Sequence, residues 1–338
     1  MLPLTFVPYG ELGERAHVVV DCAAQAATAL TLSHWPGSPT PIDLRADLSA
    51  GSAFLAAARP ELFAEIDLVT NDHFDQDGLM SAYALVAPGE ASERRAAAID
   101  VARAGDFGTF VDRDSARLAM AIAGLEDEDR TTLPAEVFAG DYGQACGALY
   151  LALLPQVSAW LDDVGALRPL WEAEDAHLSA SLDALATGAV ALREDPGRDL
   201  AVVDVPEDWV ARVAYRFTRV EAHAVHPMAV NTSTSCLRVL TRQGSRYRLE
   251  LRYETWVMLV SRPVRLRPDL RPLAVHLSAL EPAGVTWTAD PPGALTPVLE
   301  PRGGHSDLAP DVVLGAITDH LDRAAPAWDP FAARNQES

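Results

Sequence analysis

The stretch Ile66–Ala87, IDLVTNDHFDQDGLMSAYALVA, decides the fold and the candidate chemistry of this 338-residue chain. It begins with a short apolar run, Ile66–Val69, and after Gly78 it continues into a sequence of helical character. Four ionisable residues lie between these two parts: Asp72, His73, Asp75 and Asp77. This order predicts a buried strand, a polar turn and a helix. Ligands of open α/β sheets bind at the carboxyl ends of strands, so these side chains are candidates for a site.

The residue types of this cluster favour a divalent cation. Mg²⁺ and Mn²⁺ bind carboxylate oxygens, and Mn²⁺ also accepts imidazole nitrogen. Alternate residues of an extended stretch point the same way, so we expect His73, Asp75 and Asp77 to face one point. We expect Gly78 to let the backbone turn tightly into the helix. The alternative is that Asp72 and Asp75 cap the helix and that the other charges are solvated.

Two earlier apolar runs also end in polar residues. The first is His17–Asp21, which is followed by a short helix-prone stretch, Ala23–Ala27. The second is Ala29–Ser33, which is followed directly by His34 and then by a helix predicted over 47–58. Strands that alternate with short helices predict a parallel sheet, and the carboxyl ends of its strands meet at one edge. The polar residues at these ends are therefore candidate ligands together with the cluster.

The pattern changes in the second half of the chain. Further helices are predicted over 90–106, 113–125, 142–161 and 170–185. Strands are then predicted over 189–192, 200–205, 238–241 and within 246–260, followed by a helix over 269–280, a strand over 284–288 and a helix over 309–321. We predict an α/β domain over 1–180, with a parallel sheet flanked by helices, and an α+β domain over 185–333, on a mainly antiparallel sheet. Residues 334–338 are predicted to form a frayed tail.

Composition narrows the class of protein. Hydrophobic residues make up 49% of the chain, enough for a large core or two domains. No long apolar run free of charge occurs, and no basic region precedes an apolar core at the start, so we expect neither a membrane span nor a signal peptide. Cys22, Cys146 and Cys236 lie far apart, which disfavours a disulfide framework or zinc ribbon and fits a reducing cytoplasm.

The charges of the chain exclude further classes of function. The net charge of −21 opposes non-specific binding to duplex nucleic acid, but it is compatible with a small phosphate ester held by metal. All 27 basic residues are Arg. The absence of lysine excludes a Walker A phosphate loop, a pyridoxal Schiff base and a kinase-type lysine. The sequence gives no indication of the oligomeric state.

The segment DHFDQDGLMSAYAL resembles the first motif of the DHH phosphoesterase superfamily. In that motif D-x-D-G precedes a helix that opens with small residues, here Ser81 and Ala82. The family has a His upstream of the acids, where this chain has Asn71, and His73 lies nearer. The resemblance implies cleavage of phosphate esters or anhydrides with two metal ions, usually Mn²⁺. The whole chain is also similar to a bacterial family without an assigned function.

The other motifs of the superfamily have weaker counterparts in a different order. HVVVDC looks like the strand with a lone acid, which would be Asp21. ALTLSHWPGSPTP looks like the strand with an Asp-His-His triplet, in which Ser33 replaces the acid, His34 stands for a histidine and Trp35 replaces the next one. IDVARAGDFGTF resembles the fourth segment and offers Asp106. Because the D-x-D motif follows the first two segments, the resemblance implies a permuted chain.

Two segments of the second half resemble the substrate-binding part of the superfamily. VSRPVRLRPDLRPLA is similar to a stretch with a phosphate-binding Arg, which would be Arg262. RGGHSDLAP resembles a Gly-Gly-Gly-His loop that lacks one Gly, and it offers the residues Gly303, Gly304 and His305. A strand candidate, ETWVMLVS, precedes Arg262, so we expect this Arg at a sheet edge. The resemblance implies that Arg262 and the 303–305 loop face the Asp cluster across an interdomain cleft and bind phosphate.

These observations predict a cytoplasmic metal-dependent phosphoesterase that acts on a small phosphodiester, nucleotide or phosphoanhydride through metal-activated water. Two ions, Mn²⁺ or Mg²⁺, are the expected cofactors. The predicted ligands are His73, Asp75, Asp77, Asp21, Asp106 and His34. Of these, His34 and Asp75 are also predicted to act in catalysis. One alternative is a catalytically inactive relative that binds a nucleotide or metal, or serves as a scaffold, and the altered triplet favours it. Another is an unrelated α/β enzyme in which D-x-D-G is a coincidence.

Overall fold

A computed structural model describes residues 2–216, 219–282 and 284–332. Contacts within the chain divide it into two compact units. The first consists of Met1–His177, Val213–Ala222 and Leu259–Arg262, and the second of Leu178–Arg212, His223–Met258 and Pro263–Ser338. Helix α8, Arg168–Thr187, runs through the main boundary. The predicted tail, 334–338, lies outside the described residues.

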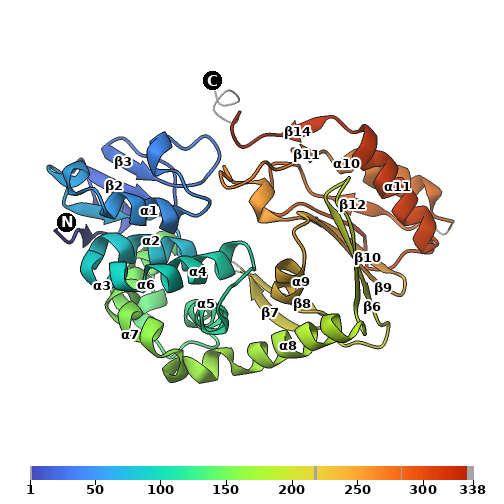
Figure 1. Ribbon diagram of the computed structural model, residues 1–338, viewed down its shortest axis with the longest axis horizontal. Helices are drawn as coiled ribbons and strands as arrows, with labels where there is room; N and C mark the ends of the chain where they lie inside the picture. Colours follow the sequence, from blue (N-terminus) through green and yellow to red (C-terminus); the bar gives the residue numbers. More distant parts are fainter. Residues whose placement is uncertain (1, 217–218, 283, 333–338) are drawn as a thin grey trace. The chain divides into compact units, whose positions relative to one another are not determined.

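A four-stranded sheet with the order β1-β4-β2-β3 forms the centre of the first unit (Figure 1). Its strands are β1 Thr5–Phe6, β2 His17–Val20, β3 Thr28–Leu32 and β4 Leu68–Thr70. All three pairings are parallel, which confirms the predicted parallel sheet. The edge strand β1 was not predicted. Strand β2 is buried throughout, as expected for an inner strand of a parallel sheet.

Helix α2 is the central helix of this unit. The helices are α1 Ser49–Ala57, α2 Gln76–Val86, α3 Pro88–Glu93, α4 Arg95–Asp106, α5 Arg113–Glu126, α6 Tyr142–Leu153 and α7 Val157–Asp162. Helix α2 packs against both α1 and α4, and ten of its residues, from Gln76 to Leu85, are buried. The polar residues at its start are therefore held in closely packed surroundings.

Three helix predictions for the first unit are wrong. The helix predicted over 90–106 is divided at Arg94 into α3 and α4. The stretch 23–27 is not helical, because only residues 21–27 connect the neighbouring strands β2 and β3. The helix predicted over 142–161 is divided into α6 and α7 by a 3-10 turn, Leu154–Gln156. Pro155 lies in that turn and has no N–H to donate to an α-helical bond.

A six-stranded sheet with the order β12-β13-β10-β9-β6-β5 forms the centre of the second unit. Its strands are β5 Ala191–Asp195, β6 Leu200–Val205, β9 Arg238–Gln243, β10 Arg246–Leu251, β12 Trp287–Ala289 and β13 Val298–Pro301. Neighbouring strands are antiparallel except for β6 and β9, which are parallel. The sheet is thus mixed, with mostly antiparallel pairs.

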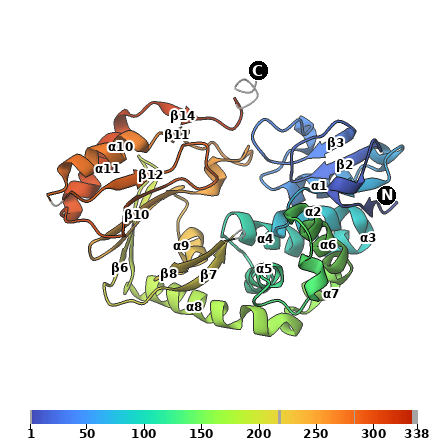
Figure 2. The same cartoon turned by 180° about the vertical axis from the view of Figure 1, so that it is seen from behind.

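Strand β6 shows why both faces of this sheet are covered. Leu200 and Val202 join one hydrophobic core, and Val203 and Val205 join another, because successive side chains of a strand point to opposite faces. The covering helices are α9 Pro227–Ser233, α10 Arg271–Leu280 and α11 Pro310–Arg323, together with the end of α8. Figure 2 shows α10 and α11 on one side of the sheet and α9 on the other.

The strand-rich stretch predicted over 246–260 is too long. Strand β10 ends at Leu251, and a 3-10 turn, Tyr253–Thr255, follows. Between them Arg252 is buried and donates to the carbonyls of Asn231 and Cys236, which draws the chain out of the sheet. Four short strands complete the described structure: β7 Arg212–Arg216, β8 Arg219–His223, β11 Arg267–Pro268 and β14 Pro326–Trp328.

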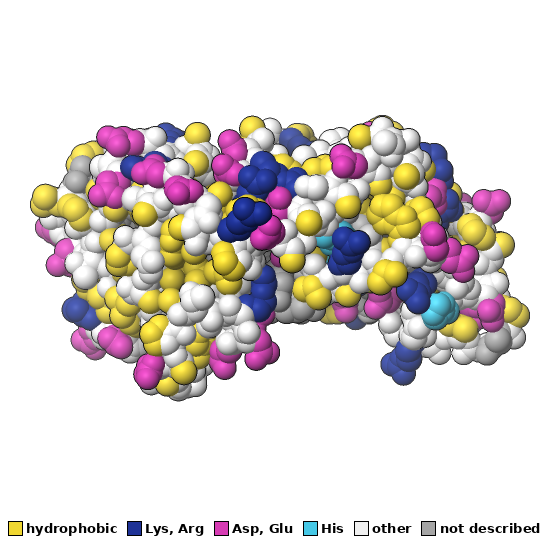
Figure 3. All heavy atoms as spheres, turned by 90° about the horizontal axis from the view of Figure 1, so that it is seen from below, with side chains coloured by type: hydrophobic (Ala, Val, Ile, Leu, Met, Phe, Trp, Pro, Cys, Tyr) yellow, Lys and Arg dark blue, Asp and Glu magenta, His cyan; other side chains and the backbone are white. Residues whose placement is uncertain are grey.

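One face of the molecule has a mixed charge pattern. On the face drawn in Figure 3, acidic side chains and arginines lie among apolar side chains, and neither sign forms an extended patch there. That face therefore does not carry the basic stripe that binds a nucleic-acid backbone. None of the described helices has the length and apolar character needed to cross a membrane.

Candidate metal centre

Three adjacent strands of the parallel sheet bring the predicted residues to one place. Asp21 follows β2, His34 lies two residues after the end of β3, and the loop after β4 carries His73 and Asp75. Because these strands are parallel neighbours, their carboxyl ends lie at the same edge of the sheet. Asp106 reaches this edge from the last residue of α4.

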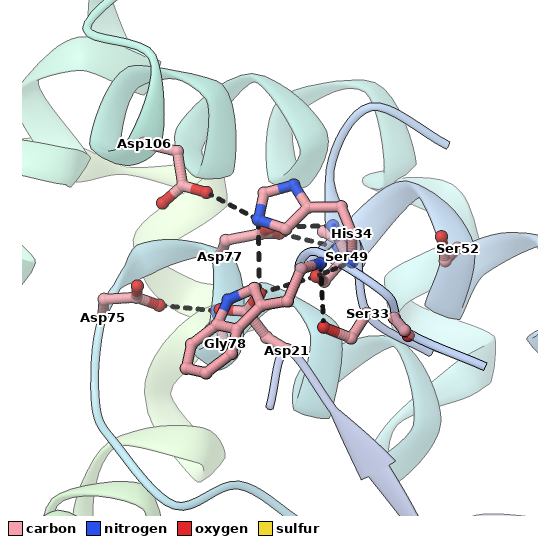
Figure 4. A network of polar contacts seen from close by, with 12 residues as sticks. Asp21, Ser33, His34, Ser49, Ser52, Asp75, Asp77, Gly78 and Asp106 are labelled. Atoms are coloured by element: carbon pink, nitrogen blue, oxygen red, sulfur yellow. Dashed lines mark hydrogen bonds and ion pairs between the residues drawn. The ribbon is translucent and has the colours of Figure 1, made fainter. Parts of the chain in front are cut away.

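The first group of possible ligands surrounds the imidazole of His34 (Figure 4). Its Nε2 atom lies 3.5 Å from Asp21 Oδ1, 3.8 Å from Asp77 Oδ2 and 3.4 Å from Asp106 Oδ2. No side chain of these four is more than 2% exposed. The four side chains form a buried cluster around His34 Nε2, in which Asp21, His34 and Asp77 are placed to share a metal ion, and we call this cluster the inner group.

The second group consists of Asp21, His73 and Asp75, and we call it the outer group. His73 Nε2 lies 3.4 Å from Asp21 Oδ2 and 3.3 Å from Asp75 Oδ2. The side chain of His73 is 20% exposed and that of Asp75 is 13% exposed. The outer group is therefore nearer to solvent than the inner group. Asp21 belongs to both groups, with one carboxylate oxygen directed to each.

The backbone of Asp21 adopts a conformation that is uncommon for residues other than glycine, although Asp adopts it more often than most. Its φ angle is 50°, in the left-handed region that non-glycine residues seldom occupy. Its N–H nevertheless continues the sheet by donating to the carbonyl of Leu32 at 3.0 Å. Strained backbone of this kind is concentrated at functional sites, which supports a functional role for Asp21.

The start of helix α1 holds two of the carboxylates. The backbone N–H groups of Ser49 and Ala50 donate to Asp77 at 2.8 and 2.7 Å, and the Ser49 hydroxyl donates to Asp21 at 2.6 Å. The same hydroxyl accepts from the N–H of His34 at 3.1 Å. A helix N-terminus favours negative charge, so α1 stabilises the carboxylates it contacts. Sequence reasoning missed Ser49, although a Ser near the start of the predicted helix over 47–58 was the available signal.

The expected geometry of Asp75 and Asp77 is wrong. They are not alternate residues of an extended stretch, because helix α2 begins at Gln76. Asp75 is the N-cap of this helix and accepts from the N–H of Gly78 at 2.7 Å, as the capping alternative predicted. Asp77 lies in the first helical turn and is directed to α1. The two carboxylates therefore serve different groups, Asp75 the outer and Asp77 the inner.

The role expected for Gly78 is also wrong. It lies inside the first turn of α2 and its φ is not positive, so it makes no tight turn. A Cβ atom at this position would lie 2.3 Å from Asn71 Nδ2 and 2.4 Å from the Tyr150 hydroxyl. Asn71 donates to that hydroxyl at 2.9 Å. Glycine is required here because the polar loop and α6 approach the helix so closely.

Each imidazole is oriented through its second ring nitrogen. His34 Nδ1 donates to the carbonyl of Asp47 at 2.7 Å, and His73 Nδ1 lies 2.9 Å from Asp72 Oδ1. Both rings therefore direct Nε2 to the carboxylates. Histidines that bind metal are commonly oriented in this way, by a hydrogen bond from the second ring nitrogen. Trp35, the residue in place of a second histidine, packs against His73 with ring centroids 5.4 Å apart.

The crowding of carboxylates perturbs their protonation. Burial, with neighbouring carboxylates adding to it, raises the pKa of Asp21 to about 6 and that of Asp77 to about 7. The same causes raise the pKa of Asp106 well above its usual value. For Asp75 burial is the largest cause and opposes ionisation, but the charge of His73 and the hydrogen bonds from His73 and Gly78 together outweigh it and lower the pKa. Buried carboxylates at this density need protons or a cation between them, so the inner group fits a cation.

Glu126, the last residue of α5, is an acid near the centre that sequence reasoning missed. Burial, and secondarily the charge of Asp75, raises its pKa to about 8. In the sequence Glu126 is recognisable only as a residue at the end of a predicted helix. That position does not indicate that it lies near the outer group.

The predicted substrate-binding residues lie in different units. Arg262 belongs to the first unit, and it follows a loop rather than a strand, so the prediction of a sheet edge is wrong. Gly303 and Gly304 form a turn after β13 with φ angles of 85° and 81°, and His305 Nδ1 lies 3.0 Å from the Ser245 hydroxyl. These three belong to the second unit. The substrate-binding role of all four residues stays a prediction.

Fold and site together define an α/β protein with acidic and imidazole side chains placed to hold a metal ion at the edge of a parallel sheet. The chain belongs to a family of unknown function, DUF6687, whose profile matches residues 2–331. No curated protein and no solved structure matches the chain. The family match extends over both units.

Proposed function

We propose that the protein is a metal-dependent phosphoesterase that acts on a small phosphodiester, nucleotide or phosphoanhydride. One observation carries the proposal: the two carboxylate oxygens of Asp21 face two different groups of possible ligands. A shared carboxylate is how two cations are held about 3.5–4 Å apart in enzymes that hydrolyse phosphate esters. The acidic chain and its lack of lysine agree with a small substrate whose charge is neutralised by metal.

The donor atoms favour Mn²⁺ over Mg²⁺. Mg²⁺ prefers an octahedron of oxygen atoms, whereas Mn²⁺ accepts imidazole nitrogen beside carboxylate oxygen. Each group contains one imidazole, from His34 or His73, together with two or three carboxylates. No cysteine belongs to either group, so the softer metals that select thiolates are disfavoured.

A bound pair of divalent cations supplies an activated water and neutralises the charge of the phosphoryl group. The residues of the chain provide the remaining conditions. The inner group excludes water, because its side chains are almost fully buried. The outer group is partly exposed, so the phosphoryl group approaches from the side of His73. Asp75, whose pKa is lowered, stays ionised at neutral pH and accepts a hydrogen bond from the attacking water.

A catalytically inactive protein that binds a metal or nucleotide, or serves as a scaffold, is the second candidate. Two replacements in the triplet favour it. Ser33 supplies no charge and instead accepts from the N–H of Trp35 at 3.2 Å. Trp35 packs against His73 and has no group that transfers a proton. Under this candidate the centre keeps its metal but lacks an acid for the leaving group.

The test begins with metal-free protein reloaded with Mn²⁺. If the protein is a phosphoesterase, we expect two bound Mn²⁺ ions per chain. We also expect turnover of bis-p-nitrophenyl phosphate, pyrophosphate or a dinucleotide. Asp21→Asn removes a ligand from both groups and should lower turnover at least about 100-fold with loss of bound Mn²⁺. Asp43→Asn is the matched control, because Asp43 is exposed and pairs with Arg59 outside the centre. Bound metal without turnover of any substrate favours the inactive protein. Absence of bound metal contradicts the phosphoesterase and the metal-binding form of the inactive protein.

A further inference from the structure

A tyrosine of helix α6 contacts both buried residues of the loop that carries the outer group. The loop follows β4, and its buried residues are Asn71, which is 2% exposed, and Phe74, which is 0% exposed. The Tyr150 hydroxyl accepts from Asn71 Nδ2 at 2.9 Å, and the Phe74 and Tyr150 rings meet edge to face with centroids 5.2 Å apart. The candidate ligands His73 and Asp75, which lie on either side of Phe74, are partly exposed. Tyr150 therefore holds the buried side of this loop.

The surroundings of Tyr150 fix the position of its hydroxyl. The side chain is completely buried, and its ring stacks on Phe6 of strand β1 with centroids 4.5 Å apart. Phe74 packs against the same ring at its edge. An aromatic ring that is packed in this way has little freedom to move in a close-packed interior. The hydroxyl is thus a rigid point of attachment for the loop.

Asn71 connects this point to His73. The amide of an asparagine donates at one end and accepts at the other. Asn71 Nδ2 donates to Tyr150, and Asn71 Oδ1 accepts from the N–H of His73 at 3.3 Å. The bond to Tyr150 therefore determines which end of the amide faces His73. The imidazole of His73 in turn directs Nε2 to the carboxylates of the outer group, whereas Asp75 is held separately as the N-cap of α2.

We propose that Tyr150 and Asn71 are positioning residues that orient His73 and thereby maintain the cation of the outer group. The inference rests on the two-cation centre of the proposed phosphoesterase and assigns the residues on which its outer cation depends. The inner group has a different support, because the start of α1 holds Asp77 and Asp21. Partners that orient a ligand typically change metal affinity 10- to 100-fold when they are removed. A change at Tyr150 should therefore separate the two cations.

The test is calorimetry of Tyr150→Phe with Mn²⁺, in which a His73→Ala variant identifies the ion of the outer group. Tyr150→Phe keeps the ring and removes only the hydroxyl that accepts from Asn71. It should raise Kd for the outer Mn²⁺ about tenfold or more and leave Kd for the inner Mn²⁺ within about threefold. At limiting Mn²⁺ the electron paramagnetic resonance signal of a coupled Mn²⁺ pair should give way to that of a single Mn²⁺. Excess Mn²⁺ should restore the pair.

Two further variants make the test specific. Asn71→Ala removes the bonds to Tyr150 and to His73, so it should weaken the outer Mn²⁺ at least as much as Tyr150→Phe does. Adding Tyr150→Phe to Asn71→Ala should then have no further effect, because the bond that it removes is already lost. Tyr83→Phe is the matched control: Tyr83 is also buried, and its hydroxyl bonds to Ser158 at 2.8 Å, outside the centre. This variant should leave both Mn²⁺ affinities unchanged.

The possible outcomes separate this inference from the proposed function. Unchanged affinity for the outer Mn²⁺ in Tyr150→Phe, equal loss of both ions, or an equal loss in Tyr83→Phe would overturn the positioning role even in an active enzyme. If the parent protein binds two Mn²⁺ ions and hydrolyses no substrate, selective loss of the outer ion in Tyr150→Phe supports the positioning role although the phosphoesterase proposal fails. A parent protein without Mn²⁺ at the outer group would overturn the inference.

Discussion

Substitution of Asp77 by Asn should change how the stability of the metal-free protein depends on pH. Asp77 is completely buried in the inner group, and burial, with the charge of Asp75 adding to it, raises its pKa from 3.8 to about 7. Because the folded state holds this proton more tightly than the unfolded state, the group stabilises the fold fully only at low pH. Its contribution is lost as the pH rises through 7.

The size of the effect follows from the two pKa values. They differ by roughly three pH units, and each unit corresponds to about 1.4 kcal/mol. Ionisation of Asp77 should therefore cost the metal-free fold about 4 kcal/mol between pH 4 and pH 8. Asn cannot ionise, but it accepts from only one of Ser49 N and Ala50 N, which should cost about 1–2 kcal/mol at every pH. The variant should thus be less stable at pH 4 and more stable at pH 8.

Urea unfolding of the metal-free parent and variant at pH 4, 5, 6, 7 and 8 measures the pH at which their free energies of unfolding become equal. Added Mn²⁺ should reverse the order at pH 8, because the parent protein gains the binding energy of the cation and the variant has lost a ligand. Asp43→Asn is the control and should follow the parent curve. Parallel pH profiles of parent and variant would refute the reasoning, since they would show that Asp77 does not titrate between those values in the fold.

The other predictions test one contact each. Asp72→Asn removes the carboxylate beside His73 Nδ1 and should weaken the binding of Mn²⁺ to the outer group about 10- to 100-fold in calorimetry. Binding of Mn²⁺ to the inner group should be unaffected, and an equal loss of affinity for both ions would contradict two separate groups. Gly78→Ala places a Cβ into Asn71 and should cost about 1–3 kcal/mol in urea unfolding, whereas no loss would show that the loop moves freely. Arg267→Met leaves carbonyls of the second unit without a donor and should cost about 3 kcal/mol; changed Mn²⁺ affinity would show that the units depend on each other.

Sequence reasoning located the candidate ligands because they depend on local patterns. Asp21, His34 and the residues around Asp75 each follow a short apolar run, and such runs become strands whose ends meet in a parallel sheet. Helices with a clear apolar period, such as 113–125 and 170–185, were predicted to within a few residues of α5 and α8. These features need no knowledge of distant contacts.

Most of the details that sequence reasoning missed depend on contacts between distant residues, and the start of α2 is a local exception. The start of α2 at Gln76 rather than after Gly78 follows from the cap that Asp75 provides, which the sequence offered only as an alternative. The bonds from Ser49 to Asp77 and from Val260 to Asp47 join residues 28 and 213 positions apart. A periodic pattern of apolar residues gives no information about contacts between residues so far apart in the chain. The hydrogen bonds that hold the residues of the centre in place could therefore not be predicted from it.

The order of strands in the sheet explains why Asp21 is the residue that both groups share. Strand β2 lies between β4 and β3, so the end of β2 has the loop of His73 on one side and His34 on the other. A carboxylate at that position reaches both neighbours, whereas a residue at the end of β3 or β4 has only one of them within reach. The order in which the motifs follow one another along the chain is irrelevant to this geometry. What matters is that an acid follows the middle strand, with one carboxylate oxygen near His34 and the other near His73.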